Sequence, residues 1–253
     1  MFNPVDDITL SRERMNAKRM RHFVPNYLEP LLSKEWEIVS IGCGSGIDVE
    51  MLRASGYRAY GFDPSRDNQF GLRKSETRPF LRSGRVEDRP FGDKKFDFAY
   101  ALEVIEHVGC RNYGTHLLPN WQEERRGFLA ESLALLRPGG HLFLSTSNRV
   151  CPFDPGHKHT YSSLGRMGAR YGVGVSVPWH EENFLFSYQQ ISKEIRMIVP
   201  TAKVTTAPIA SYPSIAGEKS FKGRLVKGLL SLIDFEPLRR SPAAPILAVV
   251  VEV

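Results

Sequence analysis

The feature that most constrains this chain is a short apolar run that ends in alternating glycines. Residues 37–41 read EIVSI, a pattern that is typical of a buried strand. Gly42, Gly44 and Gly46 follow at once, and residues 47–55 then have the apolar spacing of a helix. Glycines between a strand and a helix permit a tight turn and let the backbone approach a ligand closely. The segment therefore predicts a ligand-binding unit of strand, loop and helix.

Strand-like and helical patterns alternate along the rest of the chain. Further strands are expected at residues 57–62, 80–82, 96–102, 141–146, 204–209 and 246–251. Helical patterns cover 11–32, as one or two helices, then 121–136, where residues 137–140 (RPGG) would end the helix, and 221–233. Strands that alternate with helices imply crossover connections, and hence an α/β fold with a mainly parallel sheet.

Composition excludes several classes of protein. The chain has 253 residues, 42% of them hydrophobic and 25% charged, with a net charge of +6. These values do not fit a disordered chain, a collagen-like fibre or a disulfide-rich miniprotein. The sequence shows no apolar run long enough to span a membrane and no signal-peptide pattern at its start, and it has only three cysteines. We therefore expect a cytoplasmic protein with reduced thiols.

An acidic residue stands at the end of the second expected strand. Asp63 can accept hydrogen bonds from the hydroxyls of a ribose. The glycine spacing upstream is G-x-G-x-G, which differs from the G-x-G-x-x-G of dinucleotide-binding folds. The spacing therefore departs from the dinucleotide pattern, and Asp63 suits a ligand that contains a ribose.

Several motifs occur together in a fixed order. They read VSIGCGSG, YGFDPS, FDFAYALEVIEHV and LLRPGGHLFLSTSN, and they fall within residues 37–150. In this combination the chain resembles class I S-adenosylmethionine-dependent methyltransferases. The resemblance implies a Rossmann-like, seven-stranded sheet with helices on both faces, and S-adenosylmethionine as the cofactor. It also implies one domain over 1–253, with a helical cap at 1–36, a cofactor-binding core at 37–150, and an acceptor-side lid with the final strands at 151–253.

The resemblance assigns cofactor contacts to individual positions. Gly42, Gly44 and Gly46 would cradle the methionine part, and Asp63 would hold the ribose. The other expected cofactor contacts are Ser40, Cys43, Val86, Glu87 and Glu103.

Two positions depart from the family pattern. Ser40 stands where family members usually carry an acid that orients the methionine amine. Arg85 stands where many members carry an Asp that contacts the adenine amine, and Val86, Glu87 and Asp88 follow it. Which of these residues contacts adenine stays open.

Polar residues with metal-binding chemistry follow the fourth and fifth expected strands. If Glu103 begins a helix, then Glu103, Glu106 and His107 share one face. Two neighbouring carboxylates repel each other unless a cation or a proton intervenes. His157 and His159 follow the fifth strand, whose carboxyl end lies on the same rim of a parallel sheet. The set suits a divalent ion or a general base.

The E-x-x-E-H motif with a later histidine resembles two narrower groups. These are the ubiquinone-pathway O-methyltransferases and the small-RNA 3′-terminal 2′-O-methyltransferases. The second group's pattern implies that Glu103, Glu106, His107 and His157 hold Mg²⁺ or another divalent metal, with His159 as the second choice of histidine. Without a metal, His157, His159 or His107 is the candidate catalytic base. A third alternative is that these residues only shape the cofactor cleft.

The candidate base favours one class of reaction. A hydroxyl acceptor must lose its proton, so a histidine or a metal fits oxygen methylation better than carbon methylation. The Asn/Asp-Pro-Pro-Tyr/Phe motif of many nitrogen methyltransferases is absent, because residues 101–104 read ALEV. We therefore expect O-methylation of a small molecule, a sugar or a lipid-linked glycan. An RNA acceptor, suggested by the basic N-terminal segment, and a non-catalytic binding protein are the alternatives.

Other segments concern the acceptor and the surface. Residues 171–187 are a candidate insertion or lid, and within them we expect His180-Glu181-Glu182 to form a solvated turn, with a substrate lid as the alternative. Trp121 and Tyr113 are candidates for the acceptor pocket, although aromatic residues by default belong to the core. Residues 221–233 form a basic amphipathic pattern. We expect this helix to pack on the sheet, and the alternative is contact with an anionic membrane surface.

Overall fold

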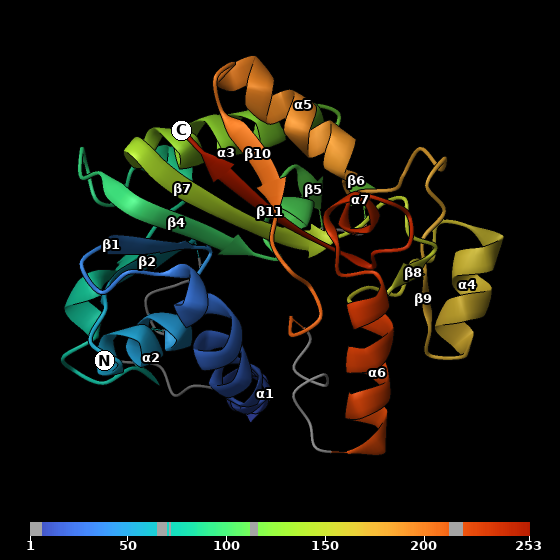
Figure 1. The fold of residues 1–253 in the computed structure, drawn as a ribbon, viewed down its shortest axis with the longest axis horizontal. Helices are drawn as coiled ribbons and strands as arrows, with labels where there is room; N and C mark the ends of the chain where they lie inside the picture. Colours follow the sequence, from blue (N-terminus) through green and yellow to red (C-terminus); the bar gives the residue numbers. More distant parts are fainter. Residues whose placement is uncertain (1–6, 65–69, 71, 112–115, 213–219) are drawn as a thin grey trace.

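A seven-stranded sheet forms the centre of the structure (Figure 1). The computed structural model describes residues 7–64, 70, 72–111, 116–212 and 220–253. In spatial order the strands are β10 (Lys203–Thr206), β11 (Ile246–Glu252), β7 (Leu136–Ser147), β4 (Phe96–Leu102), β1 (Glu37–Ile41), β2 (Arg58–Asp63) and β3 (Leu81–Ser83). Only β11 pairs antiparallel with its neighbours in this sheet. The expected mainly parallel, Rossmann-like sheet is confirmed.

Two strands begin or end at other residues than the sequence predicts. β7 begins at Leu136 and so includes the RPGG segment that was expected only to end a helix. The reason is pairing with the C-terminus, where Gly139 N donates to Val253 O at 2.7 Å and Val253 N donates to Gly140 O at 3.1 Å. β10 ends at Thr206, three residues before the expected end.

Helices cover both faces of the sheet, as expected. On one face α3 (Trp121–Ala134) and α5 (Tyr188–Ile198) bury Phe128, Leu129, Ile191 and Ile195 against β4, β7 and β11. On the other face lie α1 (Asp7–Phe23) and α2 (Ile47–Ala54), with Phe23, Val49 and Leu52 in the core. Each face therefore has its own apolar core, as a two-sided parallel sheet requires.

The N-terminal segment folds as one helix with irregular turns after it. α1 runs into a π-helical turn at Val24–Leu28 and a 3₁₀ turn at Glu29–Leu31. Pro25 lies at the start of the π turn, where a missing backbone N–H disturbs the α-helical pattern. The buried Tyr27 hydroxyl donates to Pro208 O at 2.6 Å, which ties this cap to the C-terminal half of the chain.

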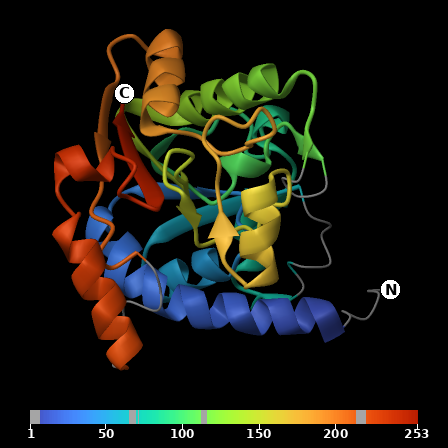
Figure 2. The same ribbon diagram turned by 90° about the vertical axis from the view of Figure 1, so that its right-hand side faces the viewer.

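The region after β7 carries small elements around a fixed loop. They are β8 (Phe153–Asp154), α4 (Ser163–Arg170) and β9 (Gly174–Val175), and α4 lies towards the viewer in Figure 2. The expected lid segment is anchored, because the Arg149 guanidinium donates to the carbonyl oxygens of Pro178, His180 and Asn183 at 2.8–3.3 Å. A short two-stranded sheet of β5 (Cys110–Arg111) and β6 (His116–Leu117) precedes α3.

The C-terminal helices lie outside the main layers. α6 (Phe221–Leu232) projects from the body in Figure 1 and is followed by α7 (Glu236–Arg239). Of the large apolar side chains of α6, Leu230 is buried, whereas Phe221, Leu225 and Leu229 are exposed. The expectation that this helix packs its apolar side on the sheet is therefore largely wrong. Within the described residues, no helix combines the length and apolar character needed to cross a membrane.

Candidate active site

The glycine loop adopts a backbone that only glycine accommodates easily. Gly42, Gly44 and Gly46 have φ angles of +72°, +56° and +78°. A Cβ atom on Gly42 would lie 2.6 Å from Val104 Cγ2, and one on Gly46 would lie 2.7 Å from Leu81 Cδ1. The loop is thus a tightly packed cradle between the ends of β1, β3 and β4.

The acid at the end of β2 is bound to this loop. The backbone N–H of Gly44 donates to Asp63 Oδ2 at 2.8 Å, and Asp63 is mostly buried. Cys43 contributes its backbone, since its N–H donates to Phe62 O at 3.1 Å. Burial raises the pKa of the Cys43 thiol well above its usual value, so this side chain stays neutral.

A cavity of about 240 Å³ opens beside the glycine loop. Its lining includes Gly42, Arg85, Val86 and Glu87, together with apolar side chains from the ends of β2 and β4. The Asp88 carboxylate instead accepts a hydrogen bond from Arg85 N at 2.7 Å, and Asp88 is not among the lining residues. Whole small-molecule sites are commonly about 300–1,000 Å³, so this cavity suits one flat, largely apolar part of a ligand.

A buried carboxylate, that of Asp48, lies beside Ser40, the position where the family usually carries an acid. Ser40 Oγ donates to Asp48 Oδ2 at 2.6 Å, and the Tyr100 hydroxyl donates to the same oxygen at 2.7 Å. All three side chains are buried, and burial raises the pKa of Asp48. Sequence reasoning missed Asp48. Its position in the first turn of α2, where an acid complements the helix dipole, was the available signal.

The N-terminal cap contacts the glycine loop through polar side chains. Ser45 Oγ donates to Glu13 Oε2 at 2.6 Å, and Glu13 also forms an ion pair with the buried Arg73. Arg73 lies 3.6 Å from a carboxylate oxygen of Glu50 on α2. These contacts hold α1 against the loop, and no sequence pattern predicts them.

Glu103 does not begin a helix, contrary to the sequence expectation. It follows β4 with φ of +55°, and a single 3₁₀ turn at Ile105–His107 comes after it. Its carboxylate lies 2.9 Å from the Arg19 guanidinium and 3.4 Å from the Tyr212 hydroxyl. Glu103 therefore points to α1 and is separated from the other acid of the E-x-x-E-H motif.

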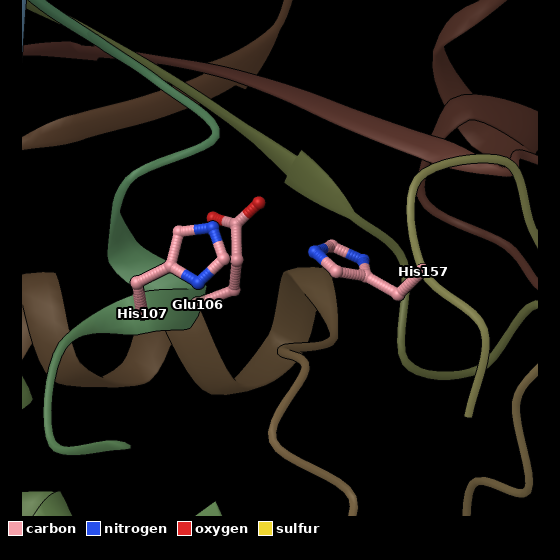
Figure 3. Close-up of side chains that lie close together, drawn as sticks. All are labelled: Glu106, His107 and His157. Atoms are coloured by element: carbon pink, nitrogen blue, oxygen red, sulfur yellow. The ribbon is translucent and has the colours of Figure 1, made fainter. Parts of the chain in front are cut away.

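Three of the four expected metal ligands converge (Figure 3). Glu106, His107 and His157 each offer a ligand atom, and these atoms lie within 4.8 Å of one another. Glu106 is fully buried, and neither of its carboxylate oxygens has a hydrogen-bond partner among the described residues. Burial raises the pKa of Glu106 to about 7. This carboxyl group can therefore hold a proton near neutral pH or accept a cation.

A buried aspartate orients both later histidines. Asp154 Oδ2 lies 3.0 Å from His157 Nδ1 and 2.5 Å from His159 Nε2, and Ser147 Oγ donates to Asp154 Oδ1 at 2.8 Å. Burial opposes ionisation of Asp154, but the hydrogen bonds from His157 and His159 outweigh it and lower the pKa of Asp154. Sequence reasoning missed this residue, although it precedes both histidines in the same segment.

The aspartate gives the two histidines different environments. Burial lowers the pKa of His157, but the hydrogen bond and charge of Asp154 outweigh burial, and the net shift is upward. A proton on Nδ1 leaves Nε2 of His157 as an acceptor, and one ring nitrogen points towards Glu106 in Figure 3. The side chain of His159 has no solvent-exposed surface. Access therefore favours His157 for contact with a ligand.

Arg125 fixes the backbone of the E-x-x-E-H segment. This buried guanidinium donates to Val108 O at 2.9 Å, Glu106 O at 3.1 Å and Phe184 O at 2.5 Å. It joins α3 to the 3₁₀ turn and to the segment before α5. No sequence pattern distinguished Arg125 from the exposed Arg126 beside it.

The acceptor-side candidates line a second cavity. Trp121, His116, Glu181 and Glu182 are among the residues around a space of about 320 Å³. The structure thus brings together Trp121 and part of the expected lid. Tyr113, the other expected aromatic residue, lies outside the described residues.

Comparison with known families agrees with this geometry. Residues 11–191 match the family described as "Methyltransferase domain". The chain belongs to this family. A ubiquinone biosynthesis O-methyltransferase of Methylobacterium nodulans is 30% identical over 177 residues, which cover 68% of this chain and 60% of that protein. A relative from Methylobacterium sp. is 31% identical over 180 residues, with the same coverage. The chain thus spans about 60% of the length of these relatives.

Solved structures show the same fold as this methyltransferase domain. A possible histamine N-methyltransferase from Thermotoga maritima has a TM-score of 0.52 at 17% identity and covers 97% of this chain and 95% of its own. The plantazolicin methyltransferase BpumL, solved with S-adenosylhomocysteine, has a TM-score of 0.53 at 14% identity and covers 97% of this chain and 89% of its own. At these identities the likeness concerns the fold alone.

The close packing of the glycine loop predicts that a Gly→Ala substitution there destabilises the protein more than one in α6. Gly46→Ala should lower the free energy of unfolding by about 2 kcal/mol, because a left-handed backbone disfavours Ala and Leu81 must move. Gly228→Ala in α6 is the control, since a Cβ there meets nothing within 4 Å and Ala favours a helix. Equal urea midpoints for both variants would contradict the cradle.

The raised pKa of Glu106 predicts a pH-dependent stability. A folded-state pKa of about 7 exceeds the ordinary 4.5, so the stabilisation from this group is complete below pH 4.5 and is lost as the pH rises through 7. Relative to Glu106→Gln, the wild type should lose about 3 kcal/mol of unfolding free energy over this range. Denaturant unfolding at several pH values measures the difference. A constant difference would show that Glu106 titrates normally.

Arg125 and its neighbour offer a matched pair of variants. Arg125→Met should lower the unfolding free energy by about 3 kcal/mol or more, because it leaves buried carbonyl groups without their donor. Arg126→Met removes only an exposed ion pair with Glu194 and should cost less than about 1 kcal/mol. Similar thermal midpoints for the two variants would contradict the role assigned to Arg125.

Proposed function

We propose that this domain transfers a methyl group from S-adenosylmethionine to a hydroxyl oxygen of a small-molecule acceptor. The observation that carries the proposal is the side chain of His157, which Asp154 orients and which faces Glu106 at the carboxyl ends of β4 and β7. Membership of the methyltransferase family and the relatives named as O-methyltransferases support the same reaction.

The residues around the first cavity fit the cofactor. Gly42, Val86 and Glu87 line the cavity, and Asp63, which accepts a hydrogen bond from the Gly44 N–H of the glycine loop, carries a carboxylate suited to ribose hydroxyls. When bound, S-adenosylmethionine supplies a methyl group that its sulfonium already activates. The protein then needs mainly to align the acceptor and to remove a proton.

His157 is the group proposed to take that proton. With Nδ1–H donated to Asp154, the lone pair of Nε2 is available to an acceptor hydroxyl, and the imidazolium that forms is stabilised by Asp154. His159 would act as a positioning residue, because its Nε2 bonds the same carboxylate and its side chain is inaccessible. His107 would shape the site beside them.

A divalent cation is the second version of this proposal. Glu106, His107 and His157 would hold it, and the unpartnered, buried oxygens of Glu106 support that fit. A bound cation supplies positive charge that lowers the pKa of an acceptor hydroxyl. Glu103, the fourth ligand expected from sequence, forms an ion pair with Arg19 and lies outside this group.

The acceptor is proposed only by class. The names of the curated relatives support an acceptor with a hydroxyl group. The cavity at Trp121 and Glu181 is a candidate space for it, because this cavity shares the lining residue Leu118 with the first cavity. A sugar or a lipid-linked glycan remains a prediction from the sequence.

The central test separates cofactor binding from proton removal. Acceptors are screened among phenols, sugars and lipid-linked glycans, and the best one is used for kinetics. His157→Ala should lower turnover about 10²–10⁴-fold while the affinity for S-adenosylhomocysteine, measured by calorimetry, stays within about twofold. His141→Ala, in the middle of β7 and away from its carboxyl end, is the control.

Two results would count against the proposal. Failure of the wild type to bind S-adenosylhomocysteine would contradict the proposed methyltransferase activity. Unchanged turnover of His157→Ala would contradict the assignment of His157 as the base. Chelation then separates the two versions, since only the cation version predicts a loss of turnover that Mg²⁺ or Mn²⁺ restores.

A further inference from the structure

α6 carries an apolar stripe that faces away from the protein. Phe221, Leu225, Leu229 and Leu232 are 76%, 52%, 56% and 71% exposed. Their spacing of four, four and three residues places them along one side of the helix. Most large apolar side chains of this chain are buried in the two cores, so a continuous exposed stripe is unusual within the described residues.

The stripe is not needed to hold the helix in place. The opposite side of α6 makes the internal contacts, through buried Leu230 and partly buried Val226, which pack on the core that contains Phe23 and Tyr27. The N-terminus of α6 is capped by Ser220, whose hydroxyl accepts a hydrogen bond from Gly223 N at 3.0 Å. The exposed stripe is therefore available to something outside the chain.

The charges beside the stripe are all positive. Residues 220–233 contain no Asp or Glu, and the exposed side chains of Arg224 and Lys227 lie on this helix. The next acid, Asp234, is engaged inside the protein, where it pairs with Arg239 at 2.8 Å. An exposed apolar stripe on a helix whose charged residues are all basic is the pattern of a helix that lies in the surface of an anionic membrane.

A second helix on the same side has the same character. In α4, Leu164 and Met167 are exposed, as is Tyr171 directly after it. Residues 155–180 contain no acid, and Arg166 and Arg170 are exposed. Both helices are visible from the side that Figure 2 shows.

We propose that α6 docks this protein on an anionic lipid bilayer, with the stripe in the interface and Arg224 and Lys227 at the headgroups. The positive charge argues against a second copy of this chain as the partner, because a symmetric pairing of α6 would oppose like charges. The proposal does not depend on the proposed methyl transfer, since it concerns a surface outside the site.

Vesicle co-sedimentation tests this proposal with a matched pair of variants. The full chain should sediment with vesicles of phosphatidylcholine and phosphatidylglycerol, and much less with phosphatidylcholine alone. Leu229→Glu should weaken that binding at least about tenfold, because it removes apolar contact and adds a negative charge. Met197→Glu on α5 is the control, since Met197 is also 56% exposed, as Leu229 is, and the charge change is the same.

Further results of these experiments would support or overturn membrane docking through α6. Arg224→Gln with Lys227→Gln should weaken binding to the anionic vesicles, about fivefold for each charge removed. No sedimentation of the wild type at low salt would overturn the proposal, and so would equal binding of Leu229→Glu and Met197→Glu. Light scattering that shows a wild-type dimer, which Leu229→Glu converts to a monomer, would assign the stripe to a second copy instead. An unchanged circular dichroism spectrum and a cooperative thermal transition of Leu229→Glu confirm that the variant is folded.

Discussion

The two halves of the site are joined where Gly42 meets Val104. The side chain of Val104 occupies the space that a Cβ on Gly42 would need, so the loop after β1 and the segment after β4 pack directly on each other. Because protein interiors are close-packed, neither segment can shift alone. The glycine loop is therefore packed against the segment that carries Glu103, Glu106 and His107, which Arg19 and Arg125 also hold in place.

The buried charged side chains near this contact differ in whether they have hydrogen-bond partners. Arg125 and Asp154 are buried but well supplied with hydrogen-bond partners, so each stabilises the segments that surround it. Glu106 is equally buried and its carboxylate oxygens have no partner in the part of the chain that the structure describes. An uncompensated buried carboxyl group is costly, and such groups concentrate at functional sites. The contrast is one of the observations that support the proposed site at Glu106 and His157.

Local sequence patterns predicted the sheet well, because strands and glycine turns depend on neighbouring residues. The strand at 96–102 has the predicted limits, and Gly42, Gly44 and Gly46 form the predicted turn. Long-range pairing was not predictable. The helix expected from Glu103 is absent because this residue adopts a left-handed backbone and pairs with Arg19 of α1. Arg125 was missed for the same reason, since its partners Val108, Glu106 and Phe184 are brought to it by the folded chain. Asp48 and Asp154 did have local signals, but those signals do not show which side chains the carboxylates bind.

The ion pair between Arg19 and Glu103 has a consequence for the N-terminal helix. It is one of the contacts that hold α1 to the end of β4, and it lies beside the glycine loop that Glu13 also touches. A ligand whose charge attracts either partner competes with this ion pair. Binding of such a ligand beside Glu103 would therefore be thermodynamically coupled to the attachment of α1 at the end of β4.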